Sequence, residues 1–419
     1  MSQFFLAYIR FFPFASQYDS ESLGDIHNGQ AKKNDVVCLR TIVTNRFVVR
    51  RFREIIINCE AKLRMDMEKK RKRKKIVCIE SFCGAGGLGL GLHKAGFEIQ
   101  SAFDWNEKAV ETYRKNLSEK AFVADIMEIE GKRLLETIGE SEIDLFAGGP
   151  PCQGFSKQKK GAHLGDSRNR LVLEYIRLTK ELKPRFFLLE NVSMLGQKRG
   201  ISFVDAIHKE LTEYDLFPHF YNSADYGLAQ TRERFIVVGK RKDLAGEFRI
   251  PAPTVEKWAT VGEVLKGLPE PPDDYSVHPD YPNHQKARVT AINELRFSYV
   301  PQGGGWRDIP PEIRLDCHKE EITAKGGWPD VYGRLRSDGQ APTITGGFDS
   351  FTRGRYGHPF SNRALTPREA ARLQGFPDDY VFVGNRHEVR HQIGNAVPPP
   401  LSEAIGKAII SCMKESNRE

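Results

Sequence analysis

The segment with the clearest chemical character is Gly148–Ser156, which has the sequence GGPPCQGFS. Its glycines and prolines predict a stiff turn that presents Cys152 directly after a predicted strand. A cysteine held in a rigid polar turn is a candidate nucleophile, because it can be exposed and stabilised as the thiolate. The plainer alternative is a turn cysteine without a chemical role. The sixth residue after Cys152 is Gln158, which excludes the CX5R motif of phosphatases.

Three charged residues could assist such a nucleophile. Glu190 follows the apolar residues of RFFLLEN, so we expect burial to raise its pKa and to suit it for proton donation. Arg232 and Arg234 alternate before FIVVGK, so both should face one side of a strand and could hold a base carbonyl or a phosphate. The alternatives are a glutamate that caps a helix and a cross-strand ion pair that involves Glu233.

A glycine-rich turn predicts a cofactor site. Gly84, Gly86 and Gly89 form the pattern GxGxxG between a predicted strand and a predicted helix, where the backbone can approach a ligand closely. Asp104 ends the next predicted strand, and its carboxylate could accept hydrogen bonds from ribose hydroxyls. The pattern alone does not distinguish a nicotinamide cofactor from S-adenosylmethionine. A glycine-rich turn without a ligand is the plain alternative.

The elements that must position these residues alternate between strands and helices. Apolar runs predict strands at 76–82, 97–104, 142–149, 185–191 and 234–240. Helical periodicity predicts helices at 87–96, 106–117 and 169–182. This alternation indicates βαβ units, and therefore a Rossmann-like α/β fold with a mostly parallel sheet.

Changes of composition divide the chain into four blocks. Residues 1–75 are expected to form a poorly structured extension that ends in a run of basic residues at 69–75. Residues 76–241 carry the α/β pattern. Residues 242–362 are rich in proline, glycine and aromatic residues, which predicts a smaller, loop-rich domain with short strands. Residues 363–419 return to helical periodicity.

Composition restricts the class of protein. The 419 residues are 40% hydrophobic and 28% charged, which is ordinary for a soluble globular protein. The formal net charge of +8 suits a polyanionic partner. The seven cysteines include no CxxC pair, which argues against a disulfide framework or a zinc ribbon and predicts a reducing compartment. No apolar stretch is long enough to predict a membrane-spanning helix.

The order of the motifs resembles that of the cytosine-C5 DNA methyltransferase family. The matching segments are FCGAGGLGLG, FDWN, Asp125-Ile126, GGPPCQGFS, ENV, QTRERFIVVG, RALTPREAARLQGFP and QIGNAVPPPL, within residues 76–241 and 363–407. The specific part is the combination of PPCQ, ENV and QxRxR. In this family a variable target-recognition domain lies between QxRxR and the last two motifs, and that position corresponds to residues 242–362.

The resemblance implies a role for each matched residue. Cys152 would be the nucleophile that adds to C6 of a cytosine, Glu190 would be its partner carboxyl, and Arg232 and Arg234 would support the flipped base. The residues that would bind S-adenosylmethionine are Phe82, Gly84, Gly86, Gly87, Asp104, Trp105, Asp125, Ile126, Pro150, Asn395 and Ala396. Asp104 would bind the ribose, and Trp105 would pack on the adenine. No metal site is implied.

The implied activity is that of a DNA (cytosine-5-)-methyltransferase of a bacterial restriction-modification system. Such an enzyme would methylate one sequence in double-stranded DNA, as a monomer in the cytoplasm associated with the nucleoid, while a cognate restriction endonuclease acts separately. Two departures from the family pattern are Glu80-Ser81, where Asp-Leu is usual, and Asp104, where glutamate is common; we expect activity with both. Three alternatives stay open: a tRNA cytosine-C5 methyltransferase of the same family, a catalytically silent DNA-binding protein, and a nicotinamide-dependent dehydrogenase.

Overall fold

The computed structural model describes residues 75–139, 142–151, 170–192, 204–205, 207–318 and 330–416. The chain divides into two compact units between Lys75 and Ile76, and every element discussed below belongs to the second unit. The extension expected at 1–75 therefore lies outside the described residues, apart from Lys75. In the described part of the chain, no helix is long and apolar enough to cross a membrane.

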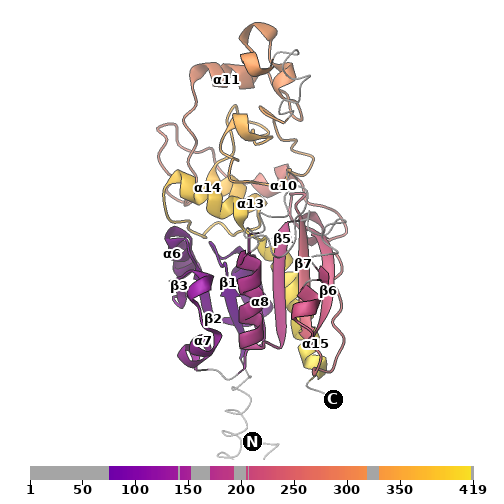
Figure 1. Ribbon diagram of the computed structural model, residues 1–419. Helices are drawn as coiled ribbons and strands as arrows, with labels where there is room; N and C mark the ends of the chain where they lie inside the picture. Colours follow the sequence, from indigo (N-terminus) through magenta and orange to yellow (C-terminus); the bar gives the residue numbers. More distant parts are fainter. Residues whose placement is uncertain are drawn as a thin grey trace, which may run out of the picture. The chain divides into compact units, whose positions relative to one another are not determined.

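One seven-stranded sheet organises the second unit, in the order β3-β2-β1-β4-β5-β7-β6 (Figure 1). The strands are β1 (Ile76–Ser81), β2 (Phe97–Asp104), β3 (Ala121–Val123), β4 (Leu145–Gly148), β5 (Phe186–Val192), β6 (Tyr214–Asn222) and β7 (Glu233–Arg241). Strands β1 to β5 pair in parallel, and β7 pairs antiparallel with both β5 and β6. The predicted Rossmann-like α/β fold with a mostly parallel sheet is confirmed.

Helices cover both faces of the sheet, which explains why its central strands are apolar on both sides. In β5, Phe186 and Leu188 join one apolar cluster, whereas Phe187 and Leu189 join the other. The first face is covered by α5 (Gly87–Ala95), α6 (Glu107–Asn116) and the C-terminal α15 (Pro399–Ser416). The second face is covered by α7 (Gly131–Ile138) and α8 (Arg170–Leu182). The last helix of the chain thus packs on the same sheet as the first helices.

The proline- and glycine-rich block has little regular structure. The short strands expected within 242–362 are absent from its described part, where isolated bridges such as Arg334–Gly357 occur instead. The α-helices of its described part are α10 (Val261–Leu265) and α11 (Ala291–Ser298), and short 3-10 helices occur as well. The buried Arg334 guanidinium donates to the carbonyls of Phe297, Val300, His358 and Ser361, and so replaces the missing ladder hydrogen bonds.

Two apolar clusters hold this block in place. One cluster lies within the block around Trp306, Tyr332 and Phe351. The other joins the block to two helices of the C-terminal segment, α13 (Pro367–Leu373) and α14 (Arg386–Asn395). Figure 1 shows α13 and α14 between the sheet and the part of the block that contains α11. The C-terminal helices therefore position the block against the sheet.

Candidate active site

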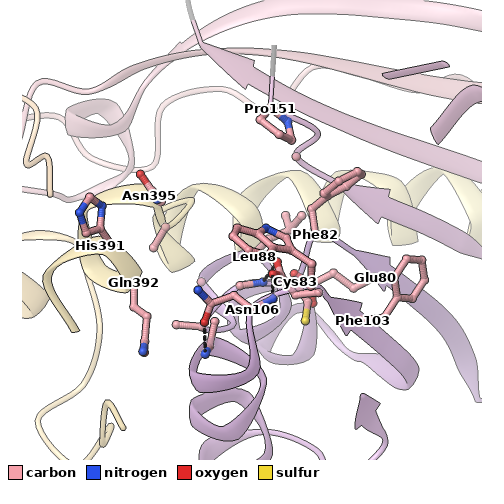
Figure 2. A pocket seen from close by; sticks show the side chains of 18 of the residues that line it. Glu80, Phe82, Cys83, Leu88, Phe103, Asn106, Pro151, His391, Gln392 and Asn395 are labelled. Carbon is pink, nitrogen blue, oxygen red and sulfur yellow. Dashed lines mark hydrogen bonds between the residues drawn. The ribbon is translucent and has the colours of Figure 1, made fainter. Parts of the chain in front are cut away.

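A cavity of about 720 Å³ lies at the carboxyl edge of the parallel strands. The loops that follow β1, β2, β3 and β4 line it, together with α14. Parallel strands end at one edge, so these loops converge although they are far apart in the sequence. Figure 2 shows His391, Gln392 and Asn395 on one wall of the cavity, with Phe82 and Pro151 across from them.

The glycine turn between β1 and α5 forms the floor of the cavity. Phe82 and Gly84 have positive φ angles of 51° and 50°, and both line the cavity together with Gly87. A Cβ on Gly87 would lie 2.3 Å from a carbonyl oxygen of the segment after α14, so only glycine fits there. Gly86 is not part of the lining, because it faces Leu117, whose methyl carbon would lie 2.5 Å from an added Cβ. Gly86 therefore shapes the turn at the start of α5.

The end of β2 contributes a carboxylate and an exposed aromatic ring. Asp104 accepts hydrogen bonds from the backbone N–H groups of Gly84 at 2.9 Å and Asn106 at 2.8 Å. Burial raises the pKa of Asp104, and these hydrogen bonds oppose the rise. Trp105 lines the cavity and is 74% exposed, which is unusual for so large an apolar side chain. Asp104 therefore offers a hydrogen-bond acceptor, and Trp105 offers a stacking surface beside it.

The loop after β3 supplies the next part of the wall. Asp125 caps the short 3-10 helix η2 (Ile126–Glu128) by accepting a hydrogen bond from the backbone N–H of Met127 at 3.0 Å. Ile126 is buried in the apolar cluster beneath, and both Asp125 and Ile126 line the cavity. The cap fixes the carboxylate at the cavity edge.

Helix α14 forms a wall that the sequence predicted only in part. Asn395 and Ala396 line the cavity as expected from the resemblance, but so do His387, His391 and Gln392. Residues 387, 391 and 395 are spaced by four and so share one face of the helix. This spacing is visible in the sequence, and it could have predicted that His391 and His387, one and two turns before Asn395, belong to the same wall.

A buried ion pair stands beside this cavity. Glu190 of β5 and Arg234 of β7 meet with 2.9 Å between Oε1 and Nε, and each side chain is 12% exposed. Burial raises the pKa of Glu190, while the guanidinium groups of Arg234 and Arg232 oppose the rise. Gly149 lies against the carboxylate, since an added Cβ would be 2.9 Å from Oε2. The carboxyl group is thereby held at the cavity rim, where it can take up or donate a proton.

The turn that follows β4 brings the PPC motif to the same place. Asn191 donates to the carbonyl of Pro150 at 3.1 Å, which ties this turn to β5 next to Glu190. Pro150, which was predicted to bind a cofactor, is buried, and it is Pro151 that lines the cavity. The predicted nucleophile Cys152 lies outside the described residues, although its neighbour Pro151 is part of the cavity wall.

Arg232 has a different environment from the one expected. It is 1% exposed, and it donates to the carbonyls of Ile344 and Gly394, both at 2.9 Å. The expectation that Arg232 and Arg234 face the same side assumed a strand at both positions, but β7 begins at Glu233. Arg232 therefore holds two backbone segments together, and we do not expect it to contact a base.

Known proteins resemble this chain in sequence and in fold. The sequence profile described as C-5 cytosine-specific DNA methylase matches residues 76–411. The chain belongs to this family. Family membership excludes the dehydrogenase interpretation of the glycine turn. The cavity described above is thus the candidate active site of a cytosine-specific methylase.

Relatives of this methylase carry similar descriptions. It is 36% identical over 355 residues to "Type II methyltransferase M.BbvI" of Brevibacillus brevis. This match covers 79% of this chain and 90% of the relative. It is also 33% identical over 341 residues to "Type II methyltransferase M1.HphI" of Haemophilus parahaemolyticus. That match covers 79% of this chain and 86% of the relative.

Solved structures have the same fold as this methylase. The match to a protein described as a DNA modification methyltransferase of an E. coli prophage has a TM-score of 0.61 and 29% identity, and covers 81% of this chain and 100% of that one. The match to the Entamoeba histolytica methyltransferase EhMeth has a TM-score of 0.57 and covers 81% of this chain and 99% of that one. At 18% identity, the second match shows the fold alone.

Proposed function

We propose that this methylase transfers the methyl group of S-adenosylmethionine to C5 of a cytosine within a specific sequence of double-stranded DNA. The observation that carries the proposal is the buried Glu190–Arg234 pair, which stands at the rim of a cavity suited to the methyl donor. The type II methyltransferases among its relatives support a role in restriction-modification. A cognate restriction endonuclease would then act separately, and we expect the methylase to work as a monomer.

The residues of the cavity fit S-adenosylmethionine. The Trp105 ring offers a face for adenine, and Asp104 and Asp125 offer acceptors for ribose hydroxyls and the adenine edge. An added Cβ on Gly84 would have no atom within 4 Å, so the backbone at Gly84 is open to a ligand. When bound, S-adenosylmethionine supplies an electrophilic methyl group.

The chemistry of cytosine defines what the rim residues must do. C5 is a weak nucleophile, and we assign its activation to the thiolate of Cys152, on the basis of the PPC motif. An S–C6 bond makes C5 electron-rich, and loss of the C5 proton after methylation lets the thiolate leave and restores the ring. Glu190 would donate a proton or a hydrogen bond to N3, and so stabilise the charge that develops on the ring during addition. Arg234 would orient Glu190 and face the O2 carbonyl of the base.

Duplex DNA hides C5 and C6 within the base stack. The target cytosine must therefore be flipped into the site, at a cost of a few kcal/mol. We propose that residues 242–362 supply the sequence-specific contacts to the DNA, because this block has its own apolar cluster and follows β7 directly. The net charge of +8 favours association with the phosphate backbone.

The test is a methyl-transfer assay with labelled S-adenosylmethionine and two substrates, bacterial genomic DNA from a strain without modification and total tRNA. Nucleosides are then separated and identified by mass spectrometry. The proposal predicts 5-methyl-2′-deoxycytidine from DNA, and none from the Cys152→Ser protein. Label in tRNA as 5-methylcytidine would instead identify an RNA enzyme. Binding of DNA without transfer by the folded wild-type protein would identify a silent DNA-binding protein.

A further inference from the structure

The segment Ile344–Asp349 of the recognition block runs along α14. Its two ends approach opposite ends of the helix, since Ile344 lies near Gly394 and Asp349 lies near Arg386. At the C-terminal end of α14, a Cβ on Gly394 would be 2.4 Å from the backbone nitrogen of Gly346. Near the middle of the helix, a Cβ on Gly346 would be 2.8 Å from Nδ1 of His391. The segment therefore follows the helix over its full length.

A buried acid fastens the far end of this segment. The Asp349 side chain is 5% exposed and is paired with two arginines of α14. Arg386 Nε lies 2.6 Å from Oδ2, and Arg390 Nη1 lies 3.4 Å from Oδ1. Arg386 also donates to the Asp349 carbonyl at 3.2 Å. A buried carboxylate between two guanidinium groups fixes geometry, because the carboxylate would be left buried without compensation if the arginines moved away.

The near end of the segment is fastened to the catalytic strand. Thr231 donates through its backbone N–H to the carbonyl of Ala341, and Gln230 accepts from the backbone N–H of Ile344 at 2.7 Å. Arg232 completes the connection by bridging Ile344 and Gly394. These residues directly precede β7, which carries Arg234. The segment is thus held between the catalytic strand and α14.

The same helix is a wall of the cofactor cavity. His387, His391 and Asn395 line the cavity, and Arg386, Arg390 and Gly394 contact the segment. His391 also lies against the segment, since a Cβ on Gly346 would be 2.8 Å from its Nδ1. Each set is spaced by four residues, so the two sets form adjacent stripes on one helix. A shift of α14 on cofactor binding would consequently move the segment as well.

We infer that Asp349 is a positioning residue, which makes the placement of segment 344–349 for DNA depend on the helix that walls the cofactor cavity. This inference rests on the proposed function. Asp349 contacts neither ligand site through its own side chain, because both carboxylate oxygens are paired with arginines of α14. It therefore acts through α14, and its effect should be on the coupling between the two ligands.

The coupling is measured as a ratio of dissociation constants. DNA binding to the full chain is titrated with and without S-adenosylhomocysteine, using a duplex that contains the target site, which bisulfite sequencing of DNA methylated by the protein locates. Coupling factors between two sites are typically about 5–150-fold, and the same factor must be obtained when the order of the ligands is reversed. A residue with a merely structural role would weaken each ligand without changing this ratio.

We expect Asp349→Asn to bring the coupling factor close to 1. The matched control is Asp338→Asn, in the same block, because Asp338 is 68% exposed and pairs only with Arg336 among the described residues. The control should keep the wild-type ratio. Should Asp349→Asn fail to fold, Arg386→Lys serves as a milder variant, since it keeps the charge and loses the hydrogen bond to the Asp349 carbonyl.

The outcomes separate the inference from the proposed function. Wild-type protein that binds neither S-adenosylhomocysteine nor DNA would refute the proposed function. Wild-type protein that binds both, with an unchanged ratio in the folded Asp349→Asn or Arg386→Lys variant, would overturn the inference alone. A wild-type ratio of 1 would also overturn it.

Discussion

The substitution Glu80→Gln tests how the floor of the cavity is built. Glu80 is 0% exposed, and its Oε2 accepts a hydrogen bond from the Tyr113 hydroxyl at 2.7 Å. Its Oε1 has no hydrogen-bond partner in the described part of the chain. The titratable side chains around it are Cys78, Cys83, Asp104, Tyr113 and Tyr380, none of which is cationic. Burial therefore raises the pKa of Glu80 to about 8.

The stability of the fold depends on pH because the folded and unfolded states bind the Glu80 proton with different affinities. The unfolded chain loses this proton near an ordinary glutamate pKa of about 4.3, whereas the folded protein keeps it until about pH 8. The folded state thus binds more protons across this window, and its stability falls as the pH rises through it. The loss is about 1.4 kcal/mol per pH unit, which amounts to roughly 4 kcal/mol between about pH 5 and pH 8. The glutamine of the Glu80→Gln protein would not titrate, and its side-chain carbonyl can still accept from Tyr113.

The assay is urea unfolding of both proteins at several pH values, without ligands. We expect the free energy of unfolding of Glu80→Gln, relative to wild type, to rise by about 1.4 kcal/mol per pH unit in this window. In Tyr113→Phe, the loss of a hydrogen bond that lowers the pKa of Glu80 should extend the wild-type trend to higher pH. Parallel curves for wild type and Glu80→Gln would refute the reasoning.

Three further predictions concern the rim and the cavity. Gly149→Ala should displace Glu190 and lower kcat at least about tenfold, while S-adenosylhomocysteine binding is retained. The control Gly339→Ala should be neutral, because the added Cβ would be 3.7 Å from the nearest atom. Equal kcat values for the two variants would contradict this prediction. Trp105→Ala should weaken S-adenosylhomocysteine by about 1–3 kcal/mol in calorimetry without lowering the melting temperature, since the ring is 74% exposed. Arg234→Met removes the charge that lowers the pKa of Glu190, so the alkaline limb of the residual kcat profile should move to higher pH; a shift to lower pH would exclude Glu190 as the acid.

Most of the sheet could be predicted because its strands are short apolar runs between glycine or polar turns. The run at 97–104 coincides with β2, and the helix predicted at 169–182 corresponds to α8, which is described from Arg170 to Leu182. The strand predicted at 142–149 is shorter, as β4 covers Leu145–Gly148. Strand β6 was not predicted. It lies at the sheet edge, contains Pro218 and has several consecutive exposed residues, so it lacks the alternation of apolar and polar residues that marks a half-buried strand.

The candidate site could be predicted where the signal was local. Glu190 and Asp104 end apolar strands, and the structure places both at the cavity. The orientation of a side chain is a different matter, because it depends on packing between distant segments. Arg232 faces two carbonyls from residues 344 and 394, and no pattern around Arg232 reveals those partners. The histidines of α14, in contrast, could have been found from the sequence, because they are spaced by four residues with the predicted Asn395.

The central claim is tested most directly by a duplex that carries 5-fluorocytosine at the target position. Fluorine at C5 replaces the proton that must leave after methylation, so the enzyme should stay bonded to the base. With S-adenosylmethionine present, we predict a complex that survives denaturation, and a DNA-linked peptide that contains Cys152. The Cys152→Ser protein should form none. Methylation of the unmodified duplex without any such adduct, or an adduct on another residue, would contradict the account.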